Sequence, residues 1–557
     1  MSSATRVDMN ATRNLIGGLQ IVNEGDGPTD HLSLRQRELD RLWRYYRCTN
    51  YDGRKYDWDG RENLDHLEHE AFAMQGTTPP GYYDAGGATT PLKFRKPTAP
   101  YYLGRVIPDR FTGMLFGRKR RPRVTVDDPK TEDWLIGFAQ ATRFWAQWIK
   151  ARTFGGGMGT VCVGFAFRKG KPSVEVHDPR WCFPEFSDRS THELRKLEKR
   201  YQYPDEVKNG DGEWETKWFW YRRVIDAQTD TVWPRVPVEG NQEPVWTQYP
   251  HNTATHGLGE VPAVWIQNQP VDDDIDGDPD CHGIYPQIEE IDALWSQAGR
   301  GTKANCDPTL EINSNLEFEE GLRKGSENAI QVEIGGKVGY LEMNGAGIET
   351  AMGLAEKLEE KALTVARCVL DRNEGGVARS PDEVDHNYSA MIDQADILRE
   401  QYGELGIQRL LEKVLRAAHK MMVGSIDRGL RVVGEPEPNP KLVRQKIQLP
   451  KRKQIVDEEN GTFEYVEREL GDGEQVELVW PDYFTPSSTE IAAVVDAAGK
   501  AKTMYGLLDL EHAVGAVASY FHVENVAALV KRLKDDQAAQ QQAQQAMMGG
   551  YPPPGTF

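Results

Sequence analysis

Two amphipathic helical segments that flank a group of short β-like runs constrain the fold of this chain most strongly. The first covers residues 284–305 and places Ile284, Ile288 and Ile291 at the three-to-four-residue spacing of one helix face. The second covers residues 348–370 and carries a similar apolar stripe. The runs "TLEI", "AIQVEI" and "VGYLEM" lie between them and are too short to be stable alone. The sequence therefore predicts two helices joined by a small β insert.

The rest of the chain mixes helical and strand-like patterns. One helix is predicted over residues 132–154, ending at the glycines of "GGGMGT", and "VCVGFAFRKGKPSVEVHD" predicts a β-hairpin. "GEVPAVWIQNQP" has the apolar character of a buried strand. We expect a long helix over residues 389–422, a two-strand region over 432–483, and a capping box at 487–490 that opens a helical section. This mixture predicts an α+β fold with several compact regions.

Composition and charge argue against several classes of protein. Asp and Glu number 86 against 67 Lys and Arg, and the resulting net charge of −19 is unlike that of a polybasic nucleic-acid binder. No apolar run approaches the roughly 20 residues that cross a bilayer, so we expect no membrane insertion. Six scattered cysteines without a CxxC pair favour a reduced, intracellular origin. Residues 1–30 are expected to be a flexible arm, and the low-complexity residues 537–557 a disordered tail.

The run "FGRKRRPRV" places five basic side chains within residues 116–124 of this acidic chain. Five cations could contact the phosphates of a nucleic acid. Pro122 and the following "VTV" also fit the entry to an exposed strand, where Lys and Arg deter pairing at the strand edge. The residues alone leave both interpretations open and favour the exposed strand.

The acidic loop "DDDIDGDPD" is the best metal candidate in the sequence. Asp272, Asp274, Asp276 and Gly277 resemble the beginning of an EF-hand calcium loop, in which alternating oxygens surround a hard cation. The twelfth position of that motif requires Glu and is Gly283 here, and a strand-like segment precedes the loop. A solvated turn is therefore the favoured interpretation.

No motif in the sequence argues for catalysis. The glycines at 155–159 follow a helix and precede a strand, which reverses the order of a phosphate-binding loop. "HLEHE" lacks the HExxH spacing, and GxSxG does not occur. We therefore expect a structural or binding role without a cofactor. A metal-dependent nucleic-acid-processing enzyme that uses the Asp-rich loop is the alternative from a different class.

The chain resembles the portal proteins of tailed bacteriophages in its order of strand, helix, small β insert, helix, broken loop and long helix. "LWRYYRCTNYDG" is similar to the N-terminal helix of that family, and "RVIPDRFTGMLFGRKRRPRV" is similar to its helix-to-strand unit. The most specific likeness is "GEVPAVWIQNQP" followed by "GIYPQIEEIDALWSQ". The resemblance covers about residues 30–535, with residues 50–100 as an insertion. It departs from the family at "GGVARSPDEVDHNYSAM", where many relatives carry a Ser-Gly-containing segment.

The resemblance implies a homo-oligomeric ring, usually a dodecamer, that is made in the host cytoplasm and lies at one capsid vertex of the virion. Double-stranded DNA would be driven through its central channel by the terminase large subunit and would leave through it at infection. The major capsid protein, the scaffold and the head-tail adaptor or neck proteins would be further partners. Another ring-forming head-tail adaptor is a second alternative. The implied regions are the wing (31–281 and, with the long helix, 389–486), the stem helices (282–305 and 348–371), the clip (306–347), the tunnel loop (372–388) and the helical crown (487–536).

Basic side chains near the stem and tunnel loop are the candidates for contacts with DNA in the channel. A conduit must not bind DNA tightly, because counterion release at many phosphates would trap the duplex. Ion pairs between subunits are an equal alternative for the four basic candidates, Arg300, Lys303, Arg372 and Arg379. The uncharged Asn373 is a fifth candidate for a contact in the channel.

The same resemblance assigns the basic run to the turn between a wing helix and its following strand, on the outer part of the ring. Arg118, Lys119, Arg120 and Arg121 are then expected to contact the acidic surface of a neighbouring subunit, the capsid shell, or DNA packed around the ring.

Overall fold

The computed structural model folds into two compact units, each built from several stretches of chain. Unit 1 contains Met1–Asp40, Asp109–Asp280 and Ile392–Phe557, and unit 2 contains Arg41–Pro108 and Cys281–Met391. The structure describes residues 32–51, 97, 99–168, 170–188, 191–208, 213–239, 244–246, 252–271, 274–306, 309–313, 333–341, 345–370, 381–423, 430–431, 447–457, 462–483, 488–503, 510–518, 529–536 and 538. The predicted arm, most of residues 50–100 and nearly all of the predicted tail lie outside these ranges.

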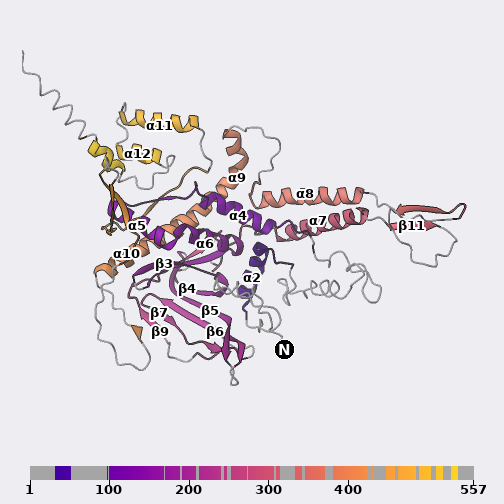
Figure 1. The fold of residues 1–557 in the computed structure, drawn as a ribbon, viewed down its shortest axis with the longest axis horizontal. Helices are drawn as coiled ribbons and strands as arrows, with labels where there is room; N and C mark the ends of the chain where they lie inside the picture. The colour runs from indigo at the N-terminus through magenta and orange to yellow at the C-terminus, as the bar shows by residue number, and fades with distance from the viewer. Residues whose placement is uncertain are drawn as a thin grey trace, which may run out of the picture. The chain divides into compact units, whose positions relative to one another are not determined.

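The chain is a mixture of helix and sheet, which confirms the α+β class (Figure 1). The helices are α2 (Leu34–Arg47), α4 (Leu103–Phe116), α5 (Pro129–Thr142), α6 (Phe144–Met158), α7 (Tyr285–Cys306), α8 (Ala346–Val365), α9 (Pro381–Arg399), α10 (Arg409–Val423), α11 (Ser488–Thr503) and α12 (Leu510–Ala518). A π-helical segment, Glu400–Gln408, joins α9 to α10. Among the described helices, none is long and apolar enough to cross a membrane.

Unit 1 contains a three-stranded sheet in the order β10-β2-β3, formed by Ala263–Gln267, Thr160–Arg168 and Lys171–His177. The predicted hairpin is therefore confirmed, and every residue of β10 is buried, as expected for "GEVPAVWIQNQP". Helices α5, α6 and α10 contact this sheet (Figure 1). Apolar side chains of β2 and β10 therefore have a helical layer to pack against.

A second, longer sheet in unit 1 follows the order β13-β9-β7-β6-β5-β4, with β8 beside β6. Its strands are β4 (Cys182–Asp188), β5 (Glu193–Lys208), β6 (Trp214–Asp226), β7 (Thr229–Val232), β8 (Val236–Pro237), β9 (Asn252–Thr255) and β13 (Leu430–Arg431). A shared core joins residues of both sheets, with Cys162 and Trp265 from the first and Leu197 and Ile225 from the second. Strand β5 was not predicted, because its many charged side chains obscure the alternation that marks a strand.

The predicted helix over 132–154 is wrong in one respect, because the chain breaks there into α5 and α6. Arg143 adopts a left-handed conformation (φ 52°). Its backbone N–H donates to the carbonyls of Ala139 and Gln140, and α5 ends there. Asp128 begins α5 by accepting a hydrogen bond from the Thr131 N–H at 2.9 Å, with Pro129 in the first turn.

The helix ends within the predicted glycine run, although four residues later than residue 154. Helix α6 runs through Gly155 and Gly156 to Met158 and is capped by Gly159, which has φ 87°. Side chains occupy the space where β-carbons would lie: a β-carbon at Gly155 would be 1.7 Å from the Tyr402 hydroxyl, and one at Gly156 would be 2.0 Å from Nη1 of Arg152. Gly155 and Gly156 therefore allow close packing, and Gly159 makes the turn into β2.

The predicted long helix over 389–422 begins earlier, at Pro381, and is interrupted by the π-helical segment. The predicted two-strand region contains the hairpin of β14 (Arg452–Asp457) and β15 (Thr462–Val466) and, in addition, β16 (Glu477–Val479). Strand β16 pairs with β1 (Arg123–Thr125), which follows the basic run. Strand β1 is therefore half-buried and paired, whereas an exposed strand was expected.

A fully buried ion pair connects four segments of unit 1. Nη2 of Arg152, on α6, donates to both carboxylate oxygens of Asp280 at 2.9 and 2.8 Å, and neither side chain is accessible to solvent. Nδ2 of Asn268 donates to Asp280 at 3.0 Å, and the Tyr402 hydroxyl donates to Oδ1 of Asn268 at 3.0 Å. Burial opposes charge on Arg152, but the Asp280 carboxylate holds the pKa of Arg152 above its ordinary value. Arg152 therefore stays charged in the folded protein.

We expect Asp280→Ala to destabilise the chain by about 3–5 kcal/mol, because it leaves the Arg152 charge buried without a partner. The matched control is Asp276→Ala, since Asp276 pairs with Arg35 where about a fifth of each side chain is exposed and water can reach the charge left behind; its cost should be smaller, about 1–2 kcal/mol. The double variant Arg152→Met/Asp280→Leu should recover most of the loss. Denaturant unfolding of the purified variants measures all three, and equal losses for Asp280→Ala and Asp276→Ala would contradict the assignment.

Candidate functional site

Unit 2 is built around a helical hairpin that ends in a two-stranded β ladder. Helices α7 and α8 lie side by side along their length (Figure 1). Strands β11 (Thr309–Asn313) and β12 (Lys337–Leu341) form the ladder, with Thr309 opposite Leu341 and Asn313 opposite Lys337. The predicted order of helix, β insert and helix is confirmed. Most of the second of the three predicted runs, "AIQVEI", lies outside the described residues.

Small side chains bring the two helices of this hairpin together. Ala298 on α7 and Ala355 and Ala362 on α8 are buried. A β-carbon at Gly301 would lie 3.1 Å from Cγ1 of Ile348, so the glycine allows the helices to approach closely there. The helical stripes identified in the sequence therefore form the contact between α7 and α8.

Buried carboxylates hold the hairpin to the segment that precedes α4. Asp292, on α7, accepts from the backbone N–H of Tyr101 at 2.6 Å and from the Tyr51 hydroxyl at 2.9 Å. The Tyr101 hydroxyl in turn donates to Glu359, on α8, at 3.2 Å. Both carboxylates are only 2% exposed. Burial raises the pKa of Asp292, while the two hydrogen bonds oppose the rise. Tyr101 therefore links the two helices of the hairpin, a role that the sequence analysis missed because Tyr101 lies in an irregular region.

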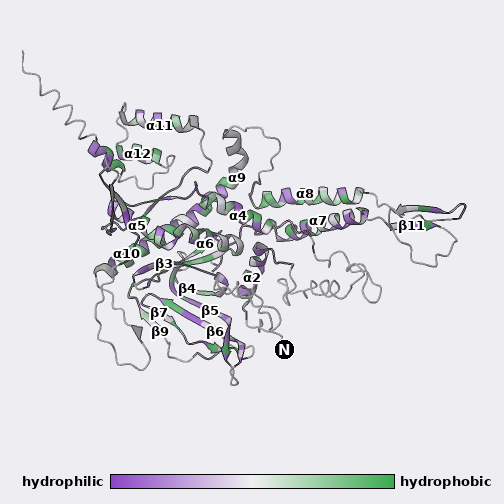
Figure 2. Cartoon of the chain, viewed as in Figure 1, coloured by the Kyte–Doolittle hydropathy of each residue, from purple (hydrophilic) through white to green (hydrophobic). Residues whose placement is uncertain are grey.

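Apolar side chains remain exposed on α8 and in the β ladder. Leu354 is 47% exposed, Val365 is 58% exposed, and Met352 and Val338 are also accessible. Figure 2 shows hydrophobic residues interleaved with hydrophilic ones along α8. Within the part of the chain that the structure describes, one stripe of α8 is buried (Ala355, Glu359 and Ala362), and the exposed apolar side chains lie outside that stripe.

The structure describes only two of the candidate DNA contacts. Arg300 is half-buried on α7 and interacts with other residues, while Lys303 is exposed in the last turn of the same helix. Arg372, Asn373 and Arg379 lie outside the described residues. The structure therefore does not test whether the five candidates lie together.

The four basic residues of the turn between α4 and β1 divide into two pairs. Arg120 and Arg121 are half-buried and donate to the last carbonyls of α4, at Gly113 (3.5 Å) and Phe116 (3.3 Å). Positive charge at the C-terminal end of a helix interacts favourably with the helix dipole and stabilises the helix. Arg118 and Lys119 are exposed and have no ion-pair partner within the described part of the chain. Only the second pair is therefore available to a macromolecular partner.

The Asp-rich loop does not assemble an EF-hand site from the residues that the structure describes. Asp276 forms a two-point ion pair with Arg35 at 2.5 and 2.7 Å, and Asp280 pairs with Arg152. Asp274 contributes a backbone carbonyl, which accepts from Nε2 of Gln267 at 2.7 Å, and Asp272 lies outside the described residues. No group of three or more potential metal ligands occurs in those residues. Arginines therefore occupy the positions that a cation would take.

Comparison of the chain with protein-family models gave no match, and comparison with curated proteins gave no significant match. Function is therefore inferred from the residues and their geometry.

Asp292→Ala should destabilise the chain by about 2–4 kcal/mol, because a buried hydroxyl and a buried N–H each lose their acceptor. Glu290→Ala is the matched control, since Glu290 is exposed on the same helix and carries the same charge; it should change stability by no more than about 0.5 kcal/mol. Thermal and denaturant unfolding measure both. If the two variants unfold alike, Asp292 does not have the role described here.

Proposed function

We propose that this chain is the subunit of a portal-type ring, a non-enzymatic conduit for double-stranded DNA at one vertex of a virus capsid. The observation that carries the proposal is the α7–α8 hairpin with its terminal β11–β12 ladder. A helical hairpin with a terminal β insert is the arrangement that the resemblance implies for the stem and clip. The preceding α/β unit would then form the wing, and α11 and α12 would belong to the crown.

The surface of the hairpin supports assembly into a ring. Exposure of apolar side chains such as Leu354 and Val365 to water is unfavourable. Contact with a second copy of the chain would bury them. A two-stranded ladder is marginal alone, and its open edges can pair with strands of a neighbouring copy. Both features favour a homo-oligomer, and a dodecamer is the count that the resemblance implies.

The charge of the chain suits passage of DNA through such a ring. A net charge of −19 disfavours tight binding of the duplex by counterion release. The terminase large subunit would drive DNA through the channel, and adaptor or neck proteins would attach at the clip. The capsid protein and scaffold would surround the ring in the virion.

Electron microscopy of the purified chain should show rings with a central hole. Leu354→Glu should shift the chain from rings to folded monomers, because it places a charge in the proposed contact between copies. Lys357→Glu is the control, since Lys357 is exposed and polar on the same helix, and its rings should persist. A wild-type chain that stays monomeric at every concentration in light scattering would overturn the proposal.

The exposed basic pair of the α4–β1 turn should act in assembly more than in DNA passage. Arg118→Gln/Lys119→Gln should reduce ring formation or incorporation into capsids several-fold and leave the fold intact, because neither side chain makes an ion pair with the described residues. Lys171→Gln/Lys451→Gln removes two exposed charges elsewhere and is the control. Normal incorporation of the first variant together with failed DNA packaging would reverse this assignment.

A further inference from the structure

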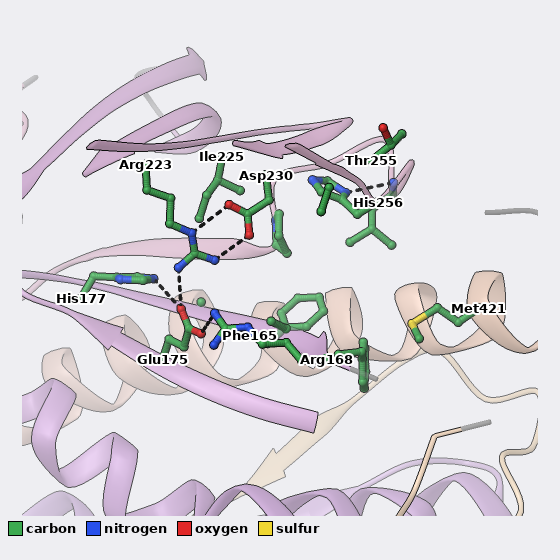
Figure 3. A pocket seen from close by; sticks show the side chains of 16 residues that line it. Phe165, Arg168, Glu175, His177, Arg223, Ile225, Asp230, Thr255, His256 and Met421 are labelled. Carbon is green, nitrogen blue, oxygen red and sulfur yellow. Dashed lines mark hydrogen bonds and ion pairs between the residues drawn. The ribbon is translucent and has the colours of Figure 1, made fainter. Parts of the chain in front are cut away.

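Unit 1 contains a cavity of about 390 Å³ between its two sheets (Figure 3). Strands β2 and β3 form one wall, and β6, β7 and β9 form the other. Met421, on α10, closes part of the boundary. Cavities of this size fall in the range that holds small organic molecules. The proposed ring function does not use this cavity.

Apolar side chains make up much of the cavity lining. Phe165, Ile225, Leu258 and Met421 are all buried and border the open space. Ala166 adds a small apolar side chain on β2. These residues favour an apolar body in the cavity, because apolar surface in contact with a ligand is removed from water.

The charged side chains that line the cavity cancel one another. Arg223 donates to Asp230 at 2.8 and 2.7 Å and to Glu175 at 2.8 Å. Arg168 pairs with the other oxygen of Glu175 (Figure 3). Two arginines therefore face two carboxylates, so neither an anion nor a cation finds an uncompensated opposite charge here.

Two histidines border the cavity, and only one of them has free hydrogen-bonding capacity. Nδ1 of His256 accepts from the Leu258 N–H at 3.3 Å, so its Nε2–H donates to the Asp226 carbonyl at 3.0 Å. His177 is 4% exposed and forms no hydrogen bond with the described residues, and the nearest carboxylate oxygen, on Glu175, is 4.0 Å from its Nε2.

The His177 ring packs closely against β2 and is neutral. A β-carbon at Gly164 would lie 3.1 Å from Nε2 of His177, so a larger residue at this position would crowd the ring. Burial, with Lys199 and Arg223 nearby, holds the pKa of His177 well below its ordinary value. A neutral imidazole can offer one donor and one acceptor to a ligand.

We propose that this cavity binds a small neutral molecule with a ring-sized apolar body and one hydroxyl or carbonyl group that hydrogen-bonds to His177. The apolar lining holds the body, the cancelled charges exclude ionised ligands, and His177 selects the polar group.

The test compares 4-methylphenol with toluene, which has the same ring and methyl group but no hydroxyl, by calorimetric titration and ligand-observed NMR. The wild-type chain should bind 4-methylphenol with a Kd on the order of 1 mM, as expected for so few atoms. Toluene should bind about fivefold more weakly, since it lacks the hydrogen bond. The charged analogues 4-methylbenzoate and 4-methylbenzylamine should bind more weakly still.

Two variants separate the hydrogen bond from the cavity itself. His177→Phe should weaken 4-methylphenol about fivefold and leave toluene unchanged, whereas His192→Phe, at a half-buried histidine that does not line the cavity, should change neither. Ala166→Phe fills the cavity from β2 and should abolish binding of both compounds. Circular dichroism and ring formation report whether each variant folds. No saturable binding to the wild type, equal binding of 4-methylphenol and toluene, or tighter binding of a charged analogue would each overturn the proposal.

Discussion

The buried ion pair between Arg152 and Asp280 is the contact on which the rest of unit 1 depends. Removing two charges from water is costly, and the cost is offset here by the pairing itself and by Asn268, which also donates to Asp280. Tyr402 completes the group from the π-helical segment, and the glycines of α6 make room for it. Asp280 is also the last residue of unit 1 before the chain enters unit 2 at Cys281. Asp280, which is buried and paired with Arg152, is therefore the residue from which the chain continues to α7.

Unit 2 also buries carboxylates, but their hydrogen-bond partners differ from those in unit 1. The hydrogen bonds described for Asp292 and Glu359 come from tyrosine hydroxyls and a backbone N–H, and no arginine takes part in them. These bonds fix the hairpin of α7 and α8 while leaving its apolar outer faces available. The proposed ring subunit needs both kinds of surface. One face of the hairpin packs within the chain, and another contacts the neighbouring copy. The acidic charge of the whole chain suits a conduit that DNA crosses without being held.

The stretches that periodicity predicted well are those with one apolar face. The stripe of Ile288 and Ile291 predicted α7, and the continuous apolar run of β10 predicted a buried strand. Periodicity did not predict the break at Arg143, because a left-handed residue inside an amphipathic pattern has no local signal without glycine. It also missed β5, because a strand half-covered by long charged side chains lacks the apolar alternation that marks a strand.

The candidate sites divide in the same way. The sequence by itself determined the helix–ladder–helix order, the location of the basic turn and the acidic net charge, because spacing and composition are local properties. Only the tertiary structure decided that Asp276 and Asp280 face arginines instead of a cation, and that Arg120 and Arg121 bond to helix carbonyls. It also decided that His177 borders an open cavity. Those outcomes depend on which distant side chain lies opposite each residue. Arg35 and Asp276 are 241 positions apart, and no pattern within one segment encodes that meeting.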